Sequence, residues 1–318
     1  MGVAAIVLWS CTVAVSRQLS ETVGATTAAA SMLLLGGGLG CLYAAVVERR
    51  LGAIFRLRPA YLLGCGLLFV TYMICLYLAI GLATSRQQAI EIGIINYLWP
   101  GLTLAFSVPI LGTRVRRSFA LGVVLALLGA VLAPLHLGEY STAMLGHTLR
   151  DHPLPYLLAL GAAVSWGLYS VLSRRWGAAE PTPSNGREIG DGGGAPSPEH
   201  PAGSDGGAVP VFALAAGLVL AAIHLGMPER SSWTGVAIGQ VLFMAVCPIL
   251  LAYALWDRAM RRGNVTLVAA LSNFAPLLST VVSSLYLHVP LSWTLWLSCG
   301  LVVLGALLAQ RAVIEPAA

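Results

Sequence analysis

The sequence contains no lysine, and charged residues of all kinds make up only 10% of its 318 positions. Soluble domains carry about 25% charged residues, so this composition excludes an ordinary soluble globule. Hydrophobic residues make up 58% of the chain, and the mean hydropathy is +0.82, which also excludes a disordered chain. We therefore expect a multi-pass membrane protein that lies in the lipid bilayer.

Motifs for metal binding and catalysis are also missing. The six cysteines lie inside apolar runs and lack the spacing of a zinc site, so we expect neither disulfides nor a metal or other cofactor. Three histidines within 136–153 are irregularly spaced, which is typical of a solvated loop. The sequence has no nucleophile–base dyad, no paired intramembrane aspartates and no His-Glu-x-x-His motif, so we do not expect an enzyme.

Ten continuous apolar runs follow one another along the chain. A helix crosses the bilayer with about 20 apolar residues, so the runs predict an all-α integral membrane protein with ten transmembrane helices. Their continuity excludes the alternating pattern of a β-barrel. The predicted helices cover residues 2–17, 25–47, 59–82, 87–110, 117–135, 154–173, 208–227, 233–256, 264–287 and 293–312.

The arginines predict the orientation of these helices. With ten helices, all but four of the 18 arginines fall on the side that carries both termini; the exceptions are Arg17, Arg86, Arg150 and Arg230. Arginine accumulates in cytoplasmic loops, so both termini are predicted to be cytoplasmic. The same distribution explains the formal charge of +5 without a nucleic-acid partner.

An internal repeat divides the chain into two halves. An offset of 176 residues pairs Tyr77 with Tyr253, Arg86 with Arg262 and Pro100 with Pro276, and an offset of 157 pairs Trp9 with Trp166 and Arg17 with Arg174. The predicted division is a first five-helix repeat at 1–135, a periplasmic loop at 136–153 and a second repeat at 154–318. Within the second repeat, 177–207 holds nine Gly and five Pro and is predicted to form a disordered cytoplasmic linker.

Five helices per repeat place the second half upside down relative to the first. Inverted repeats are typical of secondary transporters, whose substrate site lies between the repeats near the middle of the membrane. The two halves can exchange conformations, so that the cavity opens to either side in turn. Some channels also carry inverted repeats, which leaves a channel as an alternative.

Several sequence strings extend this interpretation to a family. They are Ala5-Ile6-Val7-Leu8-Trp9-Ser10, Gln88-Ala89-Ile90-Glu91-Ile92-Gly93, Asn96-Tyr97-Leu98-Trp99-Pro100, Gly263-Asn264-Val265-Thr266 and Phe274-Ala275-Pro276. In these strings and its ten helices the chain resembles the drug/metabolite transporter superfamily, in its bacterial EamA-type exporter branch. The resemblance implies export of aromatic and other neutral amino acids across the bacterial inner membrane. An exporter of another metabolite or drug, such as a nucleoside or a lipophilic cation, is the alternative.

Two prolines occupy corresponding positions of the two repeats. A proline within a helix leaves the carbonyl four residues earlier without its partner, so Pro100 frees the carbonyl of Asn96 and Pro276 frees that of Ser272. Paired helix breaks in both halves of a transporter indicate the binding site. The alternative is that both prolines merely bend their helices for packing, while nearby Ser and Thr side chains bond back to the preceding turn.

A zwitterionic amino acid needs acceptors for its ammonium group, donors for its carboxylate and flat apolar walls for an aromatic side chain. The predicted substrate-binding residues are Trp9, Tyr72, Tyr77, Glu91, Asn96, Tyr97, Trp99, Trp166, Tyr169, Tyr253, Ser272 and Asn273. Trp256 is a further candidate wall. Aromatic rings also anchor helices at the membrane interface, and this is the alternative role for each ring.

Glu91 is the one acidic residue well inside an apolar run. An intramembrane acid is a functional candidate, here for the substrate ammonium or a coupling proton. The alternative is local, with Arg86 five residues away and the helix N-terminus stabilising the negative charge.

Small residues suggest one close helix contact. Gly122 and Gly129 in the fifth helix match Ser298 and Gly305 in the tenth, and such faces allow helices to approach closely. A contact within a monomer satisfies this pattern as well as a dimer does.

Overall fold

The computed structural model describes residues 1–47, 49, 52, 57–133, 152–176, 205–226, 229–253, 255 and 272–314. Most of these residues are helical. The helices are α1 (Gly2–Ser10), α2 (Thr12–Val23), α3 (Ala25–Val46), η2 (Tyr61–Cys65), α4 (Gly66–Gly81), α5 (Arg86–Asn96), α6 (Trp99–Leu111), α7 (Ser118–Leu132), α9 (Pro153–Trp176), α10 (Asp205–Gly226), α11 (Gly235–Met244), η3 (Ala245–Leu251), α14 (Ala275–Leu287) and α15 (Trp293–Arg311); η2 and η3 are π-helical segments.

The predicted all-α membrane fold is confirmed. Within the described ranges, seven helical segments are long and apolar enough to cross a membrane, and three shorter apolar helices accompany them at Ser118–Leu132, Gly235–Leu251 and Ala275–Leu287. These segments fall on the ten predicted spans. Trp256, Arg262 and the start of the ninth predicted helix lie outside the described residues, as do 134–151 and 177–204.

Three boundaries differ from the predictions. The first span continues to Val23 and is interrupted at Cys11, and the span predicted over 87–110 consists of α5 and α6. Helix α10 begins at Asp205, so the linker predicted over 177–207 ends before that residue.

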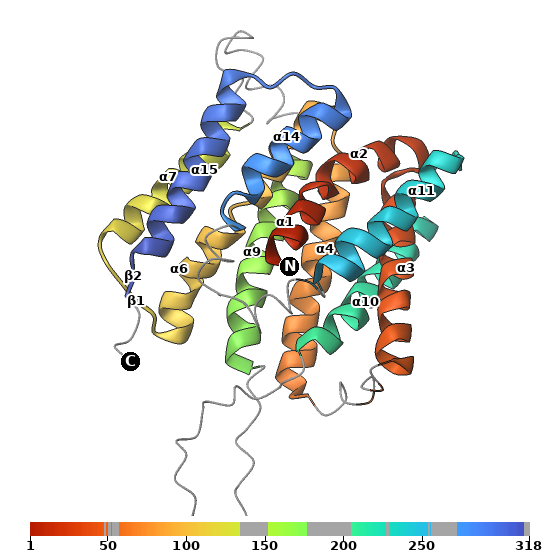
Figure 1. Ribbon diagram of the computed structural model, residues 1–318, viewed down its shortest axis with the longest axis horizontal. Helices are drawn as coiled ribbons and strands as arrows, with labels where there is room; N and C mark the ends of the chain where they lie inside the picture. The colour runs from red at the N-terminus through yellow and green to blue at the C-terminus, as the bar shows by residue number, and fades with distance from the viewer. Residues whose placement is uncertain are drawn as a thin grey trace, which may run out of the picture.

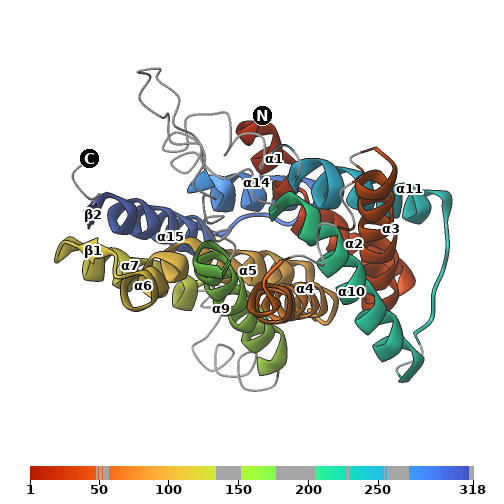
Figure 2. The ribbon, with the colours of Figure 1, turned by 90° about the horizontal axis from the view of Figure 1, so that it is seen from below.

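Helices of the two halves pack against each other in pairs. Helix α3 packs along α10, and α7 packs along α15, so that the second helix meets the seventh and the fifth meets the tenth. Figures 1 and 2 place α7 and α15 at one end of the molecule and α3, α10 and α11 at the other, with α4, α5 and α9 between them. The middle of the molecule is therefore built from both halves.

The small residues predicted for close contact face each other inside the chain. A Cβ atom added to Gly305 would lie 2.5 Å from the backbone nitrogen of Ala126 and 2.5 Å from the carbonyl oxygen of Gly122. A Cβ atom added to Gly129 would lie 2.6 Å from the carbonyl oxygen of Ser298. Helices α7 and α15 thus touch backbone to backbone, and the small-residue faces are covered within one chain.

A short sheet was not predicted from the sequence. Strand β1 (Arg114–Val115) pairs antiparallel with β2 (Val313–Ile314), with Arg114 opposite Ile314. The two strands follow α6 and α15, so they tie the end of the fourth helix of one half to the end of the tenth helix. Two residues are too few to produce a recognisable alternating pattern.

A carboxylate from a distant loop caps the N-terminus of α3. Glu229 accepts hydrogen bonds from the backbone N–H groups of Thr26 (3.0 Å) and Thr27 (3.1 Å) and from both threonine hydroxyls. Burial of the carboxyl raises its pKa, but the four hydrogen bonds outweigh burial and the net pKa of Glu229 is lowered. Gly24 precedes this cap with φ of 95° and leaves no room for a Cβ atom beside the Glu229 side chain.

The capping carboxylate predicts a pH-dependent stability. A lowered folded-state pKa means that the cap stabilises the protein above the unfolded pKa of about 4.3 and is lost as the pH falls through the folded value. At pH 7 we expect Glu229→Gln to lower the stability by about 1 to 2 kcal/mol. Thermal unfolding in detergent should show this difference at pH 7 and a smaller one at pH 4. An equal difference at both pH values would contradict the role of the charge.

Candidate functional site

Aromatic side chains from several helices form one cluster in the middle of the molecule. Phe69 and Tyr72 lie three residues apart on α4, and Trp166 and Tyr169 lie three residues apart on α9, so each pair projects from one helix face. The ring centroids of Tyr72 and Trp166 are 4.6 Å apart, and those of Trp166 and Tyr169 are 5.1 Å apart. Tyr253, two residues after η3, joins the cluster 6.2 Å from Phe69.

Trp9 extends this cluster to the first helix. Its indole N–H donates to the carbonyl oxygen of Pro248 at 3.1 Å, and its ring meets Tyr253 edge-on with centroids 5.1 Å apart. A small cavity of about 30 Å³ lies beside it, lined by Trp9, Thr12, Tyr72, Met73, Leu76, Tyr77, Pro248, Ile249 and Tyr253. Ligand pockets measure at least about 300 Å³, so this cavity is too small to hold a ligand as it stands.

Helix breaks occur at corresponding places in both halves. Helix α5 ends at Asn96, Tyr97 and Leu98 form a turn, and α6 carries Pro100 as its second residue. In the second half, Asn273 and Phe274 form the turn, and α14 carries Pro276 as its second residue. The two turns match at the offset of the internal repeat.

The polar groups at the first break lie beside the aromatic cluster. Asn96 is buried, and its side chain interacts with the Tyr72 hydroxyl. Among the described residues, the side-chain oxygen of Asn96 has no hydrogen-bond partner. The Tyr97 hydroxyl interacts with Ser279 on α14, which links the first break to the helix after the second.

Other polar residues of the breaks are engaged elsewhere. Asn273 donates a short hydrogen bond of 2.5 Å to the side-chain oxygen of Gln310 on α15. Ser272 is buried next to Asn273. Thr103 and Ser107 on α6 donate back to the carbonyls of Trp99 and Leu104, which is the packing role that serine and threonine commonly take in helices.

Glu91 lies apart from the aromatic cluster. Its side chain is buried, and its Oε2 accepts a 2.6 Å hydrogen bond from the Tyr156 hydroxyl at the start of α9. The alternative was that Glu91 pairs with Arg86. The guanidinium of Arg86 instead contacts Glu21 on α2 and the carbonyl oxygen of Leu287. Glu91 therefore ties α5 to α9.

Known proteins match this chain over nearly its whole length. The EamA-like transporter family model matches residues 1–134 and 209–310. The chain belongs to the EamA-like transporter family. It is 30% identical to a protein of Salmonella typhimurium named aromatic amino acid exporter YddG, over 98% of this chain and 96% of that protein. Proteins of the same name from Escherichia coli and Ancylobacter novellus are each 31% identical, over 98% of this chain and 96% and 97% of theirs.

A solved crystal structure supports the fold of this EamA-like protein. It is 29% identical in sequence and superposes with a TM-score of 0.64 over 98% of this chain and 96% of that chain. The bacterial exporters among the relatives, together with the apolar helices, make this EamA-like protein a multi-pass exporter of the inner membrane. The two blocks of the family match leave out all of 135–208, which includes the predicted linker.

The structure gathers most of the predicted aromatic residues of this EamA-like protein. Tyr77 lines the small cavity, and Trp99 lies 6.2 Å from Trp166. Two predicted site residues bind partners outside the cluster: Glu91 binds Tyr156, and Asn273 binds Gln310. Phe69 was not among the predicted residues. It is fully buried, and its ring packs against four rings of the cluster and against Phe212 on α10. Its position three residues before Tyr72 was the available signal.

Proposed function

We propose that this protein exports aromatic and other neutral amino acids by alternating access, through a central cavity between its two inverted five-helix repeats. Both termini face the cytoplasm in this proposal. The observation that carries it is the buried side-chain oxygen of Asn96, which lies without a hydrogen-bond partner among the described residues beside the Tyr72 end of the aromatic cluster. The names of the relatives point to the same substrate class.

The chemistry of an aromatic amino acid fits these groups. Its ring would stack among Trp9, Tyr72, Trp166 and Tyr253, where each well-placed aromatic pair adds about 1 kcal/mol beyond the area it buries. Its ammonium group would donate to the side-chain oxygen of Asn96, which satisfies a buried acceptor that costs about 1 to 3 kcal/mol when unpaired. A neutral acceptor holds the substrate without placing a permanent charge in the membrane.

The remaining groups complete the proposed site. Tyr77, Trp99 and Tyr169 would close the aromatic wall, and Tyr97 and Ser272 would supply hydrogen-bond donors to the carboxylate. The turns before Pro100 and Pro276 would act as the hinges of the two repeats. Because the small-residue faces of α7 and α15 cover each other, we propose that the protein works as a monomer.

Transport by purified protein in liposomes tests this function. We expect saturable uptake of labelled phenylalanine and tryptophan, and we expect Asn96→Ala to slow it roughly tenfold, because a hydrogen bond to a charged group is worth about 1.5 to 3 kcal/mol. The control is Thr103→Ala on α6, whose hydroxyl bonds back to its own helix and which should stay within about twofold. Folded protein that moves no amino acid would refute the proposal.

The same assay separates the alternatives. An exporter of lipophilic cations would use the buried carboxylate of Glu91, so Glu91→Gln would abolish cation transport and leave neutral amino acids unaffected. A channel would show flux that does not saturate and no counter-transport.

A further inference from the structure

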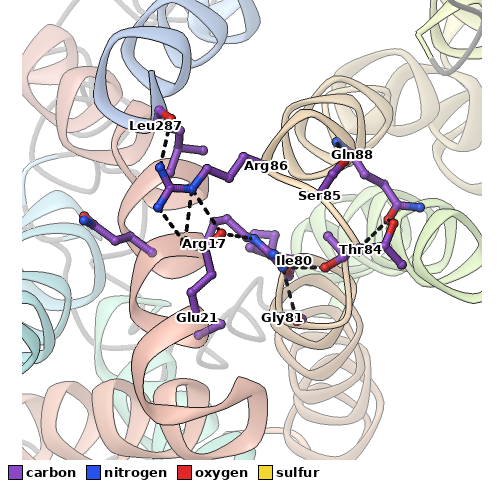
Figure 3. A network of polar contacts seen from close by, with 12 residues as sticks. Arg17, Glu21, Ile80, Gly81, Thr84, Ser85, Arg86, Gln88 and Leu287 are labelled. Carbon is purple, nitrogen blue, oxygen red and sulfur yellow. Dashed lines mark hydrogen bonds and ion pairs between the residues drawn. The ribbon is translucent and has the colours of Figure 1, made fainter. Parts of the chain in front are cut away.

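Three charged residues from two helices form a compact network at the arginine-poor end of the bundle. They are Arg17 and Glu21 on α2 and Arg86, the first residue of α5 (Figure 3). This is the end at which α2 and α14 stop and α5 begins. The distribution of arginines predicts that it faces away from the cytoplasm.

Arg17 forms the fixed base of the network. It is buried, and its Nη1 donates to the carbonyl oxygen of Ala83 at 2.5 Å, with longer contacts to those of Ile80 and Gly81. These carbonyls lie at the C-terminal end of α4, where helix carbonyls have no partner within the helix. The Nε of Arg17 holds Glu21 at 3.0 Å, one helical turn away.

Arg86 connects this base to the second half of the protein. Its Nη2 lies 2.7 Å from Glu21 Oε2, and its Nε lies 3.1 Å from both carboxylate oxygens. Its Nη1 donates to the carbonyl oxygen of Leu287 at 3.1 Å. Leu287 is the last residue of α14, and His288 then ends the helix in a left-handed conformation with φ of 55°. A cation is stabilised at this negative end of a helix.

The hydrogen bond from Arg86 to Leu287, here called the Arg86–Leu287 bridge, joins the ends of two half-helices, α5 and α14. Helix α5 runs from the arginine-poor end to the break at Tyr97, and α14 runs from the break at Phe274 back to the same end. The two half-helices contact each other. At the offset of 176 residues, α14 corresponds to α6, whereas α5 corresponds to 262–272. Arg86 and Leu287 are their outer tips, so the bridge ties together the free ends of two segments that are hinged at the breaks.

We propose that Arg86, held by Glu21 and Arg17, is the latch of the outer gate. The latch keeps the tips of α5 and α14 together and closes the outer side of the central cavity. Opening to that side breaks the Arg86–Leu287 bridge, while the contacts of Arg17 with the end of α4 stay in place. This inference rests on the proposed alternating access but not on the identity of the solute.

The two ends of the molecule are unequal in this respect. The repeat places Arg262 opposite Arg86 and Arg174 opposite Arg17, but Ala178 stands where the first half has Glu21. At the other end of the bundle, an exposed contact of 3.4 Å joins Arg175 to the carbonyl oxygen of Ile110. At the level of the sequence, the position that matches Glu21 therefore carries no carboxylate.

Cysteine accessibility tests the latch directly. Thr12 lines the small central cavity, so Thr12→Cys, in a variant with the six native cysteines replaced, reports access from outside to a membrane-impermeant thiol reagent. We expect Arg86→Ala and the isosteric Glu21→Gln each to raise the labelling rate about tenfold, as expected when a charge-assisted hydrogen bond is lost. Arg86→Lys should give a smaller rise, since lysine keeps the charge but not the planar fork.

Arg230→Ala is the matched control. Arg230 is exposed in the loop before α11 at the same end, so this variant removes the same charge without touching the network and should leave labelling within about twofold. Unchanged labelling in folded Arg86→Ala and Glu21→Gln proteins, or an equal rise in Arg230→Ala, would overturn the latch. The readout needs no substrate, so a responsive gate in a protein that moves no amino acid would refute the proposed function and keep the latch.

Discussion

Replacing Trp166 with alanine is expected to weaken phenylalanine binding about 70-fold. The Trp166 ring lies within 6.4 Å of the rings of Phe69, Tyr72, Trp99, Tyr169 and Tyr253, so it is the shared wall of the cluster. Removal of the indole takes away roughly 100 Å² of apolar surface from a stacked substrate, or about 2.5 kcal/mol at 25 cal/mol per Å². That free energy corresponds to a change in affinity of nearly two orders of magnitude.

Substrate-induced thermal stabilisation and the KM for transport both measure this effect. Trp166→Phe keeps a ring in place and should retain most of the affinity, whereas Trp296→Ala, on α15 with its side chain 45% exposed, should bind normally. A Trp166→Ala protein that is merely less stable would lose melting temperature without substrate and keep its substrate-induced shift. That outcome would give Trp166 a packing role in place of substrate binding.

Adding a single methyl group at Gly305 is expected to destabilise the protein strongly. The new Cβ would lie 2.5 Å from backbone atoms of Gly122 and Ala126. Backbone atoms cannot relieve such a clash by changing rotamer, as a side chain can. Overpacking costs about 1 to 3 kcal/mol even where side chains adjust, so we place the cost of Gly305→Ala at about 3 kcal/mol or more. For a chain of this size the melting temperature in detergent should fall by about 6 °C or more.

Gly300 on the same helix provides the control. A Cβ added there meets nothing within 4 Å, and alanine favours a helix over glycine by about 1 kcal/mol. Gly300→Ala should therefore be neutral or stabilising, opposite in sign to Gly305→Ala. Equal melting temperatures for the two variants would contradict the close approach of α7 and α15.

The sequence predicted the positions of the helices better than the contacts between them. Continuous apolar runs indicate membrane spans whatever surrounds them, because lipid requires every backbone group to be satisfied within the helix. The interruption at Cys11 and the π-helical segments η2 and η3 were not predicted, since they depend on local packing that apolar composition does not encode. Pro248 inside η3 can be read from the sequence. Its carbonyl oxygen accepts a hydrogen bond from Trp9, which is 239 residues away in the chain, and the sequence does not predict that contact.

The alternative interpretation of Glu91, a pairing with Arg86, shows the same limit. Residues five apart on a helix point about 140° away from each other, so Arg86 and Glu91 do not share a face. The sequence places Glu21 65 residues before Arg86, with nothing to connect them. Likewise Tyr156, the partner of Glu91, lies 65 residues further along the chain.

The sequence alone determined that this protein is a ten-helix membrane protein with an inverted repeat, paired helix breaks and a family resemblance to exporters. These properties depend on composition and on spacing within one helix, which are local. Only the tertiary structure decided which rings meet at Phe69, that α7 and α15 cover each other's glycines, and that Arg86 ties α5 to α14. Such contacts join residues tens to hundreds of positions apart, so they arise only when helices pack and their facing surfaces become known.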